Sequence, residues 1–88
     1  MFHHRRPSQV QMKNFARIIR EARIRLGLTQ EQLAEKLDCS AHWINNVERA
    51  KSNMNWVDTI NLLVTLQLDP RMVAEEVGIG VSVLANRK

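Results

Sequence analysis

Residues 28–51 read LTQEQLAEKLDCSAHWINNVERAK and contain two short helical patterns separated by a turn. Thr29 can accept a hydrogen bond from the backbone at the start of the first pattern. Gln32 stands three positions further, where the reciprocal partner of a capping box is found. Apolar residues then recur at helical spacing, at Leu33, Ala34 and Leu37. These signals predict a helix that begins after Thr29 and buries the apolar face formed by these residues.

The second pattern follows a turn at Asp38 and Cys39 and begins after Ser40, another good N-cap residue. Ile44 and Val47 predict its buried stripe. The opposite face carries small, polar and aromatic side chains: Ala41, His42, Trp43, Asn45, Asn46 and Arg49. Short polar side chains that point outward from the start of a helix are what the major groove of DNA can accept. The two patterns together predict a helix-turn-helix.

Three more helices are expected around this pair. The first runs from about Lys13 to Gly27, which can end it as a left-handed residue. The fourth begins after Asn55, and the fifth runs from Asp69-Pro70 to about Val77. The apolar stripe of the first helix consists of Phe15, Ile18, Ile19, Ala22 and Leu26. The fourth is expected to face inward through Trp56, Ile60 and Leu63, with Leu66 as a further candidate. Its other apolar residues, Val57, Leu62 and Val64, suggest a second buried surface.

Length, charge and composition favour one small domain. The chain has 88 residues, and its net charge of +4 is uneven. Residues 1–26 hold seven basic groups and one acidic group, whereas the remainder is slightly acidic, which indicates either a surface facing a polyanion or a solvated helix face. No apolar run approaches the roughly 20 residues of a membrane span. A single cysteine fits a reducing compartment, so a bacterial or phage protein of the cytoplasm is expected.

The two ends are expected to lie outside the domain, which spans residues 13–77. Residues 1–12 are interpreted as a mobile arm, in which Arg5-Arg6 could enter a minor groove or attract phosphates loosely. Residues 78–88 could form an edge strand, a helical turn, a disordered tail or a dimerisation element. Neither His3-His4 nor any other set predicts a metal site, a cofactor or an enzyme. Cys39 is interpreted as a small, partly buried filler.

The pattern LTQEQLAEKLDCS…I..VER.K resembles the Cro/repressor-type, Xre-like helix-turn-helix regulators, over about residues 14–77. The resemblance implies an all-α, five-helix, lambda-repressor-like domain with the helix-turn-helix at the second and third helices. It also implies a repressor-like transcriptional regulator that binds double-stranded DNA sequence-specifically. The partners implied are a second copy of the chain and a near-palindromic operator. An antitoxin with a toxin partner, a restriction controller and a protein-interaction domain without DNA binding are the alternatives.

The resemblance assigns roles to individual positions. Ala41, His42 and Asn46 fall at base-reading positions, and Asn45 on the same face joins them. Backbone contacts are expected from Gln30, Arg49 and Lys51, with Thr29 and Ser40 at the two helix starts. Trp43 could pack between helices or reach a phosphate through its indole N–H. Arg23 and Glu48 fall where a helix-one arginine pairs with a glutamate.

Three positions depart from the family pattern. Asp38 and Ala50 stand where glycine is usual, and Met54 replaces a common proline. Asp tolerates a left-handed backbone, so the turn is expected to survive. Ala50 disfavours positive φ, so the third helix is expected to end differently. Apolar residues at Val57, Val64, Met72, Val77 and in the tail predict a symmetric dimer joined through the fifth helix and residues 78–88. The alternative is a monomer in which the tail folds back over the fourth helix.

Overall fold

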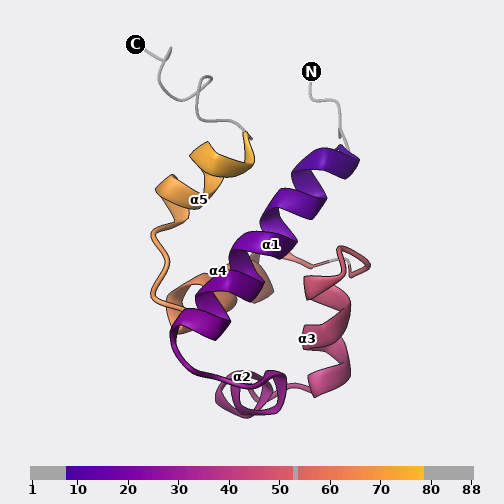
Figure 1. Ribbon diagram of the computed structural model, residues 1–88, viewed down its shortest axis with the longest axis vertical. Helices are drawn as coiled ribbons and strands as arrows, with labels where there is room; N and C mark the ends of the chain where they lie inside the picture. The colour runs from indigo at the N-terminus through magenta and orange to yellow at the C-terminus, as the bar shows by residue number, and fades with distance from the viewer. Residues whose placement is uncertain (1–7, 53, 79–88) are drawn as a thin grey trace.

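The computed structural model describes residues 8–52 and 54–78, and this part of the chain forms five helices and no strand (Figure 1). The helices are α1 (Gln9–Arg25), α2 (Gln30–Leu37), α3 (Ala41–Glu48), α4 (Trp56–Thr65) and α5 (Pro70–Val77). The predicted all-α, five-helix fold is therefore confirmed. No helix in the described ranges is long and apolar enough to cross a membrane.

Helix α1 packs against both α3 and α5. Figure 1 shows α5 and α3 on either side of α1, while α2 is seen nearly end-on below them. Helix α2 packs against both α3 and α4. Every helix contributes to one core, whose members are Ile18, Ile19, Ala22, Leu33, Ala34, Ile44, Val47, Leu62, Leu63, Leu66, Val73 and Val77. This core joins the helix-turn-helix to the other three helices.

Helix α1 begins earlier than predicted. It starts at Gln9 rather than near Lys13, because Ser8 and Gln11 form a reciprocal capping box with N···O distances of 3.1 and 3.0 Å. Gln11 Nε2 also donates to the Gly78 carbonyl at 3.0 Å, which ties the start of α1 to the end of α5. The predicted arm over residues 1–12 is thus wrong for residues 9–12, and residues 1–7 lie outside the described residues.

All five helices are followed by a residue with positive φ: Gly27, Asp38, Ala50, Gln67 and Gly78. Asp38, at φ 56°, takes the left-handed conformation expected for the turn. The prediction for Ala50 was wrong, because it keeps this conformation at φ 58°. The Ala50 amide donates to the Val47 carbonyl and the Lys51 amide to Asn46, at 3.1 and 2.9 Å. This Schellman arrangement satisfies carbonyls at the end of α3 and offsets the strain.

We expect Ala50→Gly to raise the free energy of unfolding by about 1 kcal/mol. A left-handed conformation costs a residue with a Cβ about 1–2 kcal/mol, and the greater freedom of glycine in the unfolded chain removes part of that gain. Urea unfolding would measure the change. Ala74→Gly, inside α5, is the matched control and should lower stability by about 0.5–1 kcal/mol. If both changes destabilise equally, Ala50 does not adopt the left-handed conformation.

The register of α4 also differs from the prediction. Leu62, Leu63 and Leu66 are buried, whereas Trp56 is 76% and Ile60 41% exposed. The pattern was ambiguous because apolar residues occupy both sides of this helix, so only packing decides which side faces the core. Leu26 is likewise more exposed than expected, because it is the C-cap where the chain leaves α1. The outer face of α4 consists of Trp56, Val57, Ile60 and Val64.

Candidate nucleic-acid interface

The helix-turn-helix is set by two N-caps. Thr29 Oγ1 accepts from the Gln32 amide at 3.0 Å, and Gln32 Oε1 accepts from the Thr29 amide at 2.9 Å. Ser40 Oγ accepts from the Trp43 amide at 3.1 Å. Both hydroxyls expected near phosphates therefore also fix the starts of their helices. The Cys39 amide donates to the Ala34 carbonyl at 3.0 Å, which closes the turn between the helices.

Helix α3 turns one face to the core and the other away from it. Ile44 and Val47, on the inner face of α3, are buried. His42 and Arg49 are exposed, while Ala41, Asn45 and Asn46 are half-buried. Lys51, just beyond the end of α3, is exposed as well. The structure thus brings the residues expected to read bases onto one accessible side of α3.

Two of these side chains contact each other. Asn46 Nδ2 lies 3.2 Å from His42 Nε2, one turn earlier on the same helix. An amide NH₂ group can only donate, so this hydrogen bond requires the His42 tautomer in which Nε2 is the acceptor. Sequence reasoning placed both residues on the outer face but did not find this bond.

Arg23 of α1 and Glu48 of α3 form the expected pair. Arg23 Nε and Nη2 donate to the two carboxylate oxygens of Glu48 at 2.6 and 3.0 Å. Arg23 Nη1 donates to the Leu28 carbonyl at 2.8 Å. The side chains are 12% and 3% exposed. The hydrogen bond to Glu48 raises the pKa of Arg23, although burial acts in the opposite direction. This ion pair joins α1, the start of the helix-turn-helix and the end of α3.

Gln30 is attached to the same carboxylate. Its Nε2 donates to Glu48 Oε1 at 3.2 Å, so the first residue of α2 is linked to the last residue of α3. The sequence placed Gln30 near DNA but gave no indication of this link, which depends on the angle between two helices. Glu48 therefore orients both the half-buried Arg23 and the half-buried amide of Gln30, which was expected at the DNA backbone.

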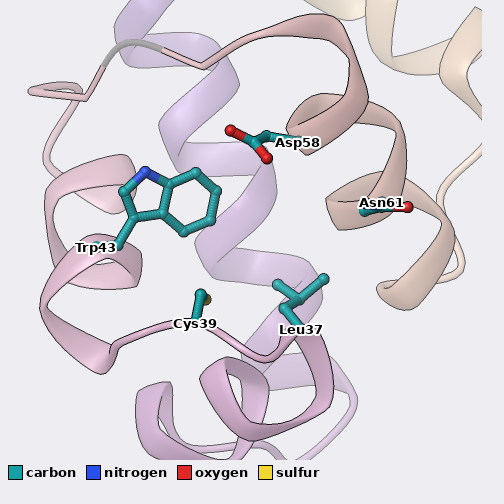
Figure 2. Close-up of a pocket in the computed structure, with 5 residues that line it drawn as sticks. All are labelled: Leu37, Cys39, Trp43, Asp58 and Asn61. Atoms are coloured by element: carbon teal, nitrogen blue, oxygen red, sulfur yellow. The ribbon is translucent and has the colours of Figure 1, made fainter.

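Trp43 lies at another edge of α3, beside a cleft of about 240 Å³ between the turn and α4. Figure 2 shows its indole directed across the cleft, with Asp58 of α4 turned toward it and Cys39 below. The indole packs against the core, which agrees with the interpretation of Trp43 as a residue that packs between helices. Cys39 is exposed rather than partly buried, which corrects its interpretation as a filler.

The surroundings of Cys39 disfavour a thiolate. Desolvation raises the pKa of the Cys39 thiol, and the nearby carboxylates of Asp38 and Asp58 raise it further. A thiol held protonated is a poor nucleophile and a poor metal ligand. Among residues 8–52 and 54–78, no group of three His, Cys, Asp or Glu side chains is placed to hold a metal ion.

Comparisons with known proteins agree with the geometry. A family model described as a helix-turn-helix domain matches residues 14–84. The fold is similar to that of the restriction-modification controller protein C.Esp1396I, with a TM-score of 0.69 and 21% identity over 80% of this chain and 92% of that chain. A point mutant of that protein gives 0.67 and 20%, over 94% of this chain and 100% of that one.

The same controller protein was also solved as a tetramer in complex with its natural 35 base-pair operator. That structure matches with a TM-score of 0.68 and 22% identity, over 80% of this chain and 97% of the controller chain. No curated protein sequence matched the chain. At these identities the likeness to the solved structures establishes the fold.

Proposed function

Since this chain belongs to the helix-turn-helix domain family, we propose that it is a repressor-like regulator that binds double-stranded DNA sequence-specifically. The observation that carries the proposal is α3, whose buried side fixes it to the core while its outer side presents His42, Asn46 and Arg49. A helix held in this way can enter the major groove, where each base pair has a distinct pattern of donors and acceptors. The similar controller protein, which was solved with its operator, supports the same use of the fold.

We assign the residues to two kinds of contact. Base contacts come from the outer face of α3, through Ala41, His42, Asn45 and Asn46. Backbone contacts come from the helix starts and the end of α3, through Gln30, Thr29, Ser40, Trp43, Arg49 and Lys51. Contacts of the second kind fix the register of the protein on DNA, whereas only the first kind reads sequence.

Selection from a pool of randomised duplexes, followed by affinity measurements on single-base variants, tests the assignment. Asn46→Ala should lose about 1–3 kcal/mol of discrimination at one base pair, the value of a good bidentate contact. Gln30→Ala should weaken binding to all variants alike. Thermal unfolding is the control for Gln30→Ala, because that change also removes the bond to Glu48. If the wild-type protein enriches no sequence, the proposed function is wrong.

We also propose that the protein binds DNA as a homodimer on a near-palindromic operator. The structure removes Val77 of α5 from the expected interface, because this residue is buried. The part of the expected interface in residues 79–88 lies outside the described residues. Eight large apolar side chains are exposed among the described residues, and four of them, Trp56, Val57, Ile60 and Val64, lie on the outer face of α4. That face is therefore the centre of the proposed interface.

A second copy of the chain is the occupant that fits the outer face of α4. Asp58 is the one charged residue of α4, and it lines the cleft beside Trp43. A two-fold interface places a surface against its own copy, so a face without charge avoids like-charge repulsion. The basic surface of α1, placed against its own copy, would instead bring like charges together. A standard interface buries about 800 Å² per partner. Residues around the outer face of α4 must therefore contribute a rim to the interface.

A further inference from the structure

We infer that His42 fixes the orientation of the Asn46 amide, so that the two side chains read DNA as one unit and Asn46 selects adenine. The inference rests on the proposed function and adds a specificity-determining role for His42 at a base pair that Asn46 contacts. It starts from the 3.2 Å distance between Asn46 Nδ2 and His42 Nε2.

The chemistry of the two groups determines which atoms stay free. Asn46 Nδ2 carries two hydrogens, and His42 Nε2 accepts one of them. The second N–H and the Oδ1 oxygen remain available for a base. Adenine offers a matching pair in the major groove, with N7 as acceptor and the N6 amino group as donor. The amide held by His42 therefore has its donor and its acceptor in a fixed order.

Without this bond the amide loses its preferred orientation. Rotation by half a turn about its last bond exchanges Oδ1 and Nδ2, and each orientation suits a different base edge. A side chain at position 42 that can only donate would favour the opposite orientation, in which Oδ1 is engaged and both N–H groups face the base. Two donors suit the N7 and O6 acceptors of guanine. Position 42 thus controls which base Asn46 prefers.

Three variants at position 42 test this control, with base preference measured by selection from randomised duplexes. In His42→Ala the preference for adenine at the Asn46 base pair should fall from about tenfold or more to about twofold or less, because the bidentate geometry is no longer enforced. His42→Gln should keep the preference, since a glutamine one turn earlier can accept from the amide through Oε1. His42→Lys should shift the preference toward guanine.

Glu75→Ala is the control, because Glu75 is exposed on α5, outside the proposed DNA-binding surface, and its loss should leave the adenine preference intact. Circular dichroism on each variant checks that the overall helix content is unchanged. The inference is overturned if His42→Ala keeps the full preference or if His42→Gln loses as much as His42→Ala. Wild-type protein that enriches no sequence would instead overturn the proposed function, so the two failures are distinguishable.

Discussion

Glu48→Ala is expected to lower the free energy of unfolding by about 3–5 kcal/mol, because it leaves the guanidinium of Arg23 buried without a carboxylate. The Glu48 side chain is 3% exposed and receives two hydrogen bonds from Arg23 and one from Gln30. Its removal therefore unlinks α1, α2 and α3 at one point. The remaining bond from Arg23 to the Leu28 carbonyl cannot neutralise the charge.

Urea unfolding of the single and double variants would measure the coupling free energy between Arg23 and Glu48. Replacement of both residues by methionine should cost less than Glu48→Ala alone, since no uncompensated charge stays buried. The exposed pair of Arg17 and Glu21, with an N···O distance of 3.2 Å and side chains about half exposed, is the matched control. Its coupling should be about 0.5 kcal/mol or less. A coupling between Arg23 and Glu48 no larger than the control would show that the buried pair contributes nothing specific.

Local signals predicted the helices well, because a cap needs only a side chain three residues from its partner. Thr29 with Gln32, Asn55 with Asp58, and Ser40 all start helices where expected. The missed box of Ser8 and Gln11 has the same spacing, so the signal was present and the arm interpretation overrode it. The inward face of α4 had no such local signal. Its two faces are both apolar, and contact with the other helices decides between them.

The candidate site was predictable as a surface but not as a set of contacts. Helical spacing places His42 and Asn46 on the face opposite Ile44 and Val47, and the structure agrees. The bond between His42 and Asn46 depends on side-chain rotamers that spacing leaves free. The bond from Gln30 to Glu48 crosses two helices, so it depends on their packing angle. Such contacts decide how these side chains are oriented, and they follow only from the three-dimensional packing of the helices.

Val64→Lys is expected to weaken self-association at least about 100-fold and to reduce operator affinity with it. Val64 is 65% exposed on the outer face of α4, and a two-fold interface there would bring the new charge close to its own copy. A single domain of this size reads too few base pairs for useful specificity, so loss of the dimer should also remove most discrimination. Sedimentation velocity at micromolar concentration, with and without a palindromic duplex of half-sites about 34 Å apart, would measure both effects.

Met72→Lys is the matched control, because Met72 is equally exposed at 62% but belongs to α5. If α4 forms the interface, Val64→Lys should be monomeric, whereas Met72→Lys and a chain ending at Gly78 should still associate. The opposite result, with association lost in Met72→Lys or in the shortened chain and kept in Val64→Lys, would return the interface to the fifth helix and the tail. A wild-type protein that stays monomeric even on the palindromic duplex would contradict both surfaces, because two recognition helices one DNA turn apart require two copies.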